Sequence, residues 1–129
     1  MFTKIVIETR KREEIVDITS YLANFVSGLS ITEGLLYLYC THTTCGLTIN
    51  ESADPAVKND LIRFFRSIAP QTGWEHMEGN SDAHIRSSLL GVSLLIPVEA
   101  SRLLLGTWQA IYFYEGDGPR TRAILAKII

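Results

Sequence analysis

The sequence has few cysteines, prolines and histidines. Its 129 residues include two cysteines, Cys40 and Cys45, four prolines and three histidines. Two thiols cannot supply the dense disulfide framework of a small secreted domain, and their spacing is not the Cys-x-x-Cys of a structural zinc site or redox pair. No export signal is recognisable at the N-terminus. We therefore expect reduced thiols and a cytoplasmic protein.

An excess of charge is also missing. The net charge is −2 and the isoelectric point is about 5.9. A nucleic-acid partner is not expected, because neutralising a phosphate backbone requires a concentrated basic surface. The one charge run, residues 10–14, mixes both signs and indicates a solvated edge. Apolar runs such as residues 94–96 and 103–105 fall far short of the roughly 20 residues that span a bilayer, so no membrane segment is expected.

What the sequence does contain is typical of one globular domain over residues 1–129. Apolar residues make up 47% and charged residues 20% of the chain. A chain of this length buries roughly two thirds of its unfolded surface on folding, which is enough for a single core. No repeat, low-complexity tract or linker divides it. A single domain follows from this uniformity.

Hydrophobic periodicity predicts a mixture of strands and helices. Alternating or apolar β-branched segments predict strands at residues 3–9, 14–17, 34–42, 47–50, 91–98, 102–115 and 121–129. Helical spacing predicts helices at residues 18–26, 55–68 and 82–90. The order lacks a strict alternation of strand and helix. It favours an α+β fold with antiparallel or mixed β-sheets in a sandwich-like arrangement, flanked by helices.

Local signals predict the helix ends. Asp17 or Thr19 can cap the first helix, and Gly28 is typical of a left-handed residue at its end. Asp54 followed by proline predicts the start of the second helix. Ser81 or Asp82 can cap the third helix, and Gly91 ends it. These signals set the helix boundaries that the structure can test.

His76 and His84 are separated by eight positions. On a continuous helix this separation spreads their Cα atoms by about 12 Å, and on a strand by about 26 Å, too far for two imidazoles to share an ion. They converge only if the chain reverses, and Gly79 and Asn80 tolerate the left-handed dihedrals that a reversal needs. His84 would then stand on the first turn of the third helix.

His42 follows a strongly hydrophobic strand and is the third candidate. With His76 and His84 it would give three neutral imidazoles and an open fourth position, the arrangement of a catalytic divalent metal such as zinc. The alternative is that these histidines cap helices or bond within turns.

Other polar residues near the histidines each have two interpretations. Glu51 is either a general acid or base or a solvated carboxylate, and Asp82 is explained by capping alone. Thr43 and Thr44 either offer hydroxyl groups to an anion or serve strand propensity. Cys45 is a nucleophile by residue type alone.

Two further pairs lie in the C-terminal third. Trp108 is expected in the core, with Gln109 on the opposite face of the strand, where its amide can read a ligand. Arg120 and Arg122 lie at i, i+2 on an extended segment and suit a phosphate or carboxylate. Two unliganded surface arginines are the alternative.

At these segments the chain resembles a known family. HTTCGLTINE at 42–51, HMEGNSDAH at 76–84 and LLLGTWQAIYFYEGDGPRTR at 103–122 are similar to the YjbQ-like proteins, the secondary thiamine-phosphate synthase family. The chain departs from many members of the family at residues 100–102, where they have a glycine before the Leu-Leu-Leu-Gly-Thr-Trp-Gln run. This departure changes a hairpin turn. The resemblance implies a compact α+β fold and a homotrimer. It also places on the family's shared polar positions the residues His42, Glu51, His76, Asn80, His84, Trp108, Gln109 and Arg122.

The resemblance also implies an activity, the joining of a hydroxymethylpyrimidine diphosphate to a thiazole phosphate. On this basis Glu51, Asn80 and His84 are the expected catalytic residues. The expected ligand is a small phosphorylated or anionic molecule, held by Thr43, Thr44, Trp108, Gln109, Arg120 and Arg122. Zinc at the three histidines, or Mg²⁺ in its place, would stabilise the departing diphosphate. A metal-dependent hydrolase and a non-catalytic ligand-binding trimer are the alternatives.

Overall fold

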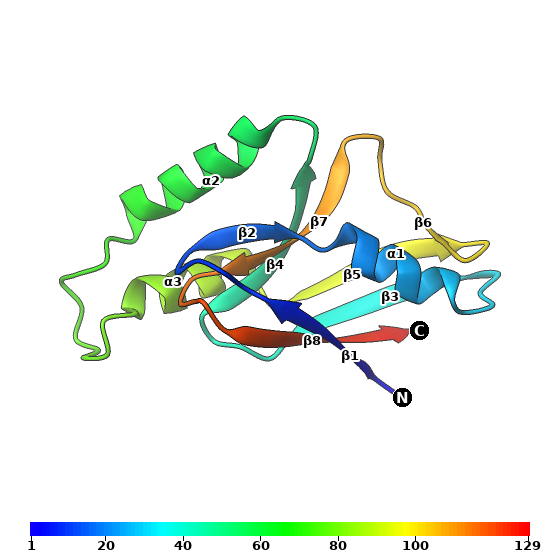
Figure 1. Ribbon diagram of the computed structural model, residues 1–129, viewed down its shortest axis with the longest axis horizontal. Helices are drawn as coiled ribbons and strands as arrows, with labels where there is room; N and C mark the ends of the chain where they lie inside the picture. Colours follow the sequence, from blue (N-terminus) through cyan, green and yellow to red (C-terminus); the bar gives the residue numbers. More distant parts are fainter.

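The computed structural model describes residues 1–129 and shows two antiparallel β-sheets facing each other (Figure 1). The larger sheet has the order β1-β8-β3-β5-β6 and the smaller sheet β2-β7-β4. Every strand pairing is antiparallel, which confirms the predicted α+β sandwich with flanking helices. The elements are β1 Thr3–Glu8, β2 Glu14–Asp17, α1 Thr19–Ser27, β3 Glu33–Cys40, β4 Cys45–Glu51, α2 Pro55–Ile68, α3 Ser81–Leu90, β5 Ser93–Glu99, β6 Arg102–Leu103, β7 Gln109–Glu115 and β8 Thr121–Ile128.

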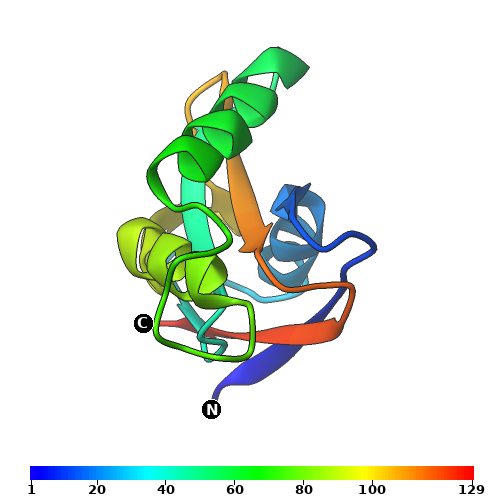
Figure 2. The same cartoon turned by 90° about the vertical axis from the view of Figure 1, so that its left-hand side faces the viewer.

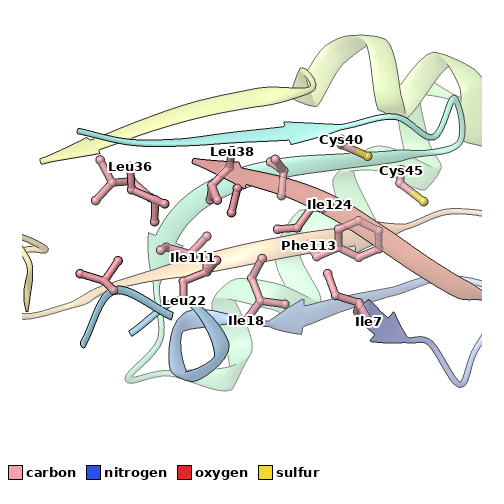
Figure 3. Close-up of a cluster of buried hydrophobic side chains, with 14 of the residues drawn as sticks. Ile7, Ile18, Leu22, Leu36, Leu38, Cys40, Cys45, Ile111, Phe113 and Ile124 are labelled. Carbon is pink, nitrogen blue, oxygen red and sulfur yellow. The ribbon is translucent and has the colours of Figure 1, made fainter. Parts of the chain in front are cut away.

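The main core lies between the two sheets and α1 (Figure 3). Leu36 and Leu38 of β3 reach it from the larger sheet, and Ile111 and Phe113 of β7 reach it from the smaller one. Leu22 of α1 closes one side. Alternate residues of a strand point to the same face, so the period-two pattern of β3 supplies this core directly.

A second apolar cluster lies on the other face of the smaller sheet, beneath α2. Phe65 of α2 packs edge-on against Tyr114 of β7, with ring centroids 5.6 Å apart, and Tyr112 joins them. Strand β7 is therefore buried on both faces, which explains its unbroken apolar and aromatic sequence. Figure 2 shows α2 and α3 on one side of β4 and β7, with α1 on the other.

Helix α3 packs along β4 because Gly46 leaves room for its last turn. A Cβ atom at Gly46 would lie 2.9 Å from the Cβ of Leu90 and 3.1 Å from the carbonyl oxygen of Gly91. Gly91 has a φ of 92°, so it ends α3 as predicted. This close approach fixes the helix that carries His84.

Several predicted boundaries are confirmed. The Asp54 carboxylate accepts the Ala56 N–H at 2.9 Å and caps α2, as predicted. At the start of α1 the N-cap position is Ile18, which has no side-chain cap, while Asp17 just before it accepts the Thr19 N–H at 2.9 Å. The hairpin turn between β5 and β6 holds Ala100 and Ser101 at φ values of 52° and 57°, where a left-handed turn requires them.

Three local predictions were wrong. The single strand predicted at 102–115 is interrupted between β6 and β7 by a turn in which Gln109 Oε1 accepts the Gly106 N–H. Gly28 has a right-handed φ of −76°, because its N–H bonds back to Asn24 as one more helical turn. Helix α3 starts after Asn80 without a side-chain cap, since Asp82 turns inward.

No helix in the chain is both long enough and apolar enough to cross a membrane.

Candidate functional site

His76 and His84 come together as the chain reverses between them. Their imidazole rings have centroids 5.3 Å apart and are nearly perpendicular, at 89°. Gly79, at a φ of 81°, supplies the left-handed residue of the reversal, and His84 lies on the first turn of α3 with its N–H bonded to the Asn80 carbonyl. The two histidines therefore converge in the fold, although a continuous helix or strand would keep them apart at this spacing.

His42 lies two residues beyond β3, and its ring is held by the backbone of β8. Its Nε2 accepts the Ala123 N–H at 3.1 Å, so the hydrogen of the neutral ring is on Nδ1. Burial, together with the positive charge of Arg122, lowers the pKa of His42. The ring is therefore neutral near pH 7, and it can bind a metal only by releasing Ala123.

Two cavities meet at His84. The first, of about 630 Å³, has a polar wall of imidazole and hydroxyl groups and also borders Cys40. The second, of about 570 Å³, is bordered by an indole, an imidazole and an isoleucine. His84 is in the lining of both, with His42, Thr43, Ser87 and Ser88 in the first and Trp74, His76 and Ile85 in the second.

The donor set around these cavities suits a metal only in part. No group of three or more His, Cys, Asp or Glu side chains is arranged to hold an ion. Within one chain, the residues offer the His76 and His84 pair, while His42 is engaged elsewhere. Two imidazoles are fewer than the three that a three-histidine zinc centre requires.

Arg122 is committed to a buried ion pair. Its Nε and Nη2 donate to the two oxygens of Glu115 at 2.8 and 2.6 Å, and Nη2 also donates to the Thr44 hydroxyl at 3.0 Å. Arg120 instead donates from Nε to the Asp117 carbonyl oxygen at 2.9 Å and remains largely exposed. The two arginines therefore do not form a joint anion clamp in this chain.

Burial alone would raise the pKa of Glu115. The hydrogen bonds from Arg122, from the Asp117 N–H and from the Thr9 hydroxyl outweigh burial and lower that pKa. Glu115 is therefore ionised across the physiological range and anchors the end of β7 beside Thr44.

Glu51, Trp108 and Gln109 lie at the opposite end of β4 from the histidines. Glu51 pairs with Gln109, whereas Cys45 at the other end pairs with Glu115. The six residue steps between these ends span about 20 Å. Trp108 precedes β7 and is 61% exposed, so its expected place in the core was wrong, because the Gly106 turn carries it outward.

Asn80, an expected catalytic residue, is buried at the start of α3. Its Nδ2 donates to Asp117 Oδ2 at 2.9 Å, which ties α3 to the turn after β7. Its Oδ1 is buried without a hydrogen-bond partner. Asn80 thus positions the first turn of the helix that presents His84.

The two thiols are free and buried, and both lie in the main core (Figure 3). The Cys45 thiol donates to Glu115 Oε2 at 3.4 Å. The neighbouring Cys45 thiol is the main cause that lowers the pKa of Cys40 to about 7, whereas the proximity of Cys40 raises the pKa of Cys45. Of the two, Cys40 is therefore the more readily ionised, and it borders the first cavity.

Sequence reasoning missed an ionic network beside α3. Asp82, expected to cap the helix, is 1% exposed and accepts from Arg12 at 3.1 Å and from Arg86 at 3.0 Å. The run at 10–14 is not simply a solvated edge, because Glu13 is buried against Arg86 at 2.9 Å. The i, i+4 spacing of Asp82 and Arg86 on a predicted helix could have indicated their ion pair from the sequence. The role of Glu13 could not be predicted in this way, because it depends on tertiary packing.

Comparison with known proteins identifies relatives over the full fold. A family model described as UPF0047 protein YjbQ-like matches residues 3–129. A UPF0047 protein of Methanocaldococcus jannaschii is 50% identical, covering 100% of this chain and 94% of its own. The UPF0047 protein YugU of Bacillus subtilis is 48% identical, covering 100% and 99%.

Solved structures with a similar fold include a member of the same family. A crystal structure of a YjbQ/UPF0047 family protein from Clostridium acetobutylicum is similar, with a TM-score of 0.94 and 42% identity over 98% of this chain and 99% of its own. A hypothetical protein from Aeropyrum pernix gives a TM-score of 0.93 at 34% identity, covering 100% and 98%. The chain therefore belongs to the YjbQ-like UPF0047 protein family.

Proposed function

We propose that the protein is an enzyme resembling the secondary thiamine-phosphate synthases, with its reaction centre where the two cavities meet at His84. The observation that carries this proposal is the shared lining. His84 faces a hydroxyl-rich cavity on one side and, with His76, a cavity bordered by Trp74 on the other. Two neighbouring cavities suit a reaction that joins two small molecules.

The chemistry is the displacement of diphosphate. The thiazole nitrogen forms a bond to the pyrimidine methylene carbon, while the bond from that carbon to the diphosphate oxygen breaks and diphosphate leaves with the electron pair. Hydrogen-bond donors in the first cavity, namely the His84 imidazole and the hydroxyl groups of Thr43 and Ser87, can stabilise that departing charge. Trp74 offers a flat face to a heterocycle in the second cavity.

A divalent ion fits this proposal through His76 and His84. Zinc suits their imidazole nitrogens. Mg²⁺, the alternative, prefers oxygen ligands, and the carboxylate beside His76, that of Glu78, is exposed to solvent. When bound, such an ion supplies positive charge for the leaving diphosphate. The protein's own part is to hold the two rings 5.3 Å apart at a chain reversal.

Assembly as a homotrimer is part of the proposal. Glu51, Trp108 and Gln109 lie about 20 Å along β4 from the histidine end, so they can join the histidines in one site only from another copy. The exposed Trp108 supports this role, since a large exposed aromatic is typical of a contact surface. Light scattering coupled to size-exclusion chromatography tests it, with a trimer mass expected and a monomer mass contradicting it.

The activity is tested by incubating the purified protein with the pyrimidine diphosphate and the thiazole phosphate and measuring thiamine phosphate. Turnover is expected in the wild type and is expected to be lost in His84→Ala. Lys4→Ala, an exposed change on β1, is the matched control and is expected to retain full turnover. If no thiamine phosphate forms with zinc, Mg²⁺ or other divalent ions, the proposed synthase activity is wrong.

A metal-dependent hydrolase is the second candidate, favoured by the close approach of His76 and His84, since an ion held by two imidazoles alone would keep positions for water. An ion there would lower the pKa of a bound water. Metal-dependent hydrolysis of a phosphate-ester panel, lost in His84→Ala, would support it over the synthase.

A further inference from the structure

A third cavity lies on the other side of α3 from the histidines. It measures about 350 Å³ and has no hydrophobic lining residue. Three guanidinium groups and two carboxylates surround it, contributed by the segment before β2, by α2 and by α3. The lining residues are Arg12, Glu13, Arg66, Pro70, Gln71, Asp82 and Arg86.

The Glu13 carboxylate is fully engaged. Its Oε1 accepts from Arg66 Nε at 2.7 Å, and its Oε2 accepts from Arg86 Nη1 at 2.9 Å and from the Tyr114 hydroxyl at 2.6 Å. Each oxygen already holds at least one strong donor. Glu13 is therefore neutralised by the walls of the cavity rather than directed at a ligand.

The Asp82 carboxylate is engaged in the same way. Arg12 donates to it from Nη2 at 3.1 Å and from Nη1 at 3.3 Å, and Arg86 donates to it at 3.0 Å. With three guanidinium groups against two carboxylates, the cavity carries one uncompensated positive charge. The charge balance thus favours an anionic ligand.

The unused donors belong mainly to Arg66. Only its Nε has a partner, so both terminal nitrogens are free, and its side chain is 65% exposed at the mouth of the cavity. The Nε of Arg12 is also without an acceptor. Guanidinium nitrogens in this arrangement match the oxygens of a tetrahedral oxyanion.

We propose that this arginine-lined cavity binds a small phosphate-class oxyanion, either inorganic phosphate or the phosphate group of a small molecule. Arg66 provides the direct contacts, while Arg86, buried and bonded to Glu13 and Asp82, holds the walls in place. The site is separate from the histidine cavities, because Asp82 and Arg86 line this cavity whereas His84 and Ser88 line the first one. It stands independently of the proposed synthase activity.

The test is a phosphate titration of the full-length protein, followed by calorimetry and by the thermal unfolding midpoint, against sodium chloride at equal ionic strength. Phosphate is expected to bind the wild type and raise its midpoint, and to bind Arg66→Ala about tenfold more weakly. Arg63→Ala, which removes an exposed arginine from the same helix outside the cavity, is the matched control and should bind as the wild type does. Circular dichroism checks that each variant is folded.

Three results would overturn the proposal. One is an equal response to chloride and phosphate, which would reduce the effect to screening. Another is unchanged binding by Arg66→Ala. The third is loss of phosphate binding in His84→Ala with Arg66 intact, which would assign the anion to the histidine cavities. Phosphate binding that persists in His84→Ala supports the site even if thiamine phosphate synthesis fails.

Discussion

Arg122 and Glu115 are joined by two hydrogen bonds, at 2.8 and 2.6 Å, although both side chains are buried. The pair links the end of β7 to the start of β8, and Thr44 adds the turn before β4. Breaking one partner of a buried pair costs about 3–5 kcal/mol, because the other charge is left without compensation. Arg122 is next to Ala123, whose N–H bonds the His42 ring, so the pair stabilises the part of β8 that holds this histidine.

Replacing Glu115 by glutamine is expected to destabilise the protein near pH 7. The free energy of unfolding of the variant should also fall less than that of the wild type as the pH is lowered. The folded-state pKa of Glu115 lies below its ordinary value of 4.5, so its contribution is present above 4.5 and is lost as the pH falls through the lowered pKa. Urea unfolding from pH 7 to acid measures this. An acid dependence identical to that of the wild type would contradict it.

Metal content is expected to separate the three histidines. His76→Ala and His84→Ala should each lose a stoichiometric divalent ion, whereas His42→Ala should retain most of it, because His42 Nε2 is bonded to Ala123. Elemental analysis of each purified variant beside the wild type gives the answer. Full metal retention in all three variants would rule out the proposed pair, and loss in His42→Ala would show that this ring leaves Ala123 to bind the ion.

Adding a methyl group at Gly46 is expected to displace α3. The new Cβ would lie 2.9 Å from Leu90, so Gly46→Ala should cost about 1–3 kcal/mol and move His84 away from its neighbours. Gly28→Ala is the control, since its nearest neighbours are 3.6 Å away at a helical φ. Denaturant unfolding of both variants measures the difference, and equal stability would contradict the packing argument.

Ionisation of Cys40 is expected near neutral pH. The neighbouring Cys45 thiol is the main cause that lowers the pKa of Cys40 to about 7, so the Cys40 thiolate should form as the pH rises through that value. Ultraviolet absorbance of the thiolate reports this without a reagent having to reach the buried sulfur. The transition should vanish in Cys40→Ser, and a transition only at the ordinary thiol pKa would contradict the expectation.

The sequence predicted those parts of the fold that depend on local chemistry. Alternation in β3 and the Asp54 cap of α2 are each read from a few neighbouring residues. The sequence also located the reversal that convergence of His76 and His84 requires, because Gly79 and Asn80 tolerate left-handed dihedrals, and Gly79 adopts one. Gly106 by contrast marked a turn inside an apolar run, and its effect on Trp108 was overlooked.

The rest of the candidate site depends on contacts between residues that are distant in sequence. Nothing near Glu13 indicates that Arg86, 73 positions later, will neutralise it in the interior. Likewise, the spacing of Arg120 and Arg122 predicts a joint clamp, yet Glu115 takes the donors of Arg122. Pairing of charges is decided by which elements pack together, and single-sequence patterns do not contain that information.

Helix α3 presents a different ionic or polar pair to each side. Asp82 and Arg86 face the arginine-lined cavity, while His84 and Ser88 face the histidine cavity. The buried Asp82–Arg86 pair, the buried Ala83 and the close contact of Leu90 with Gly46 together hold the helix. Because salt screens buried ion pairs much less than exposed ones, the Asp82–Arg86 pair should persist at high ionic strength, and the amide hydrogens of α3 should then stay protected as those of β3 and β7 do.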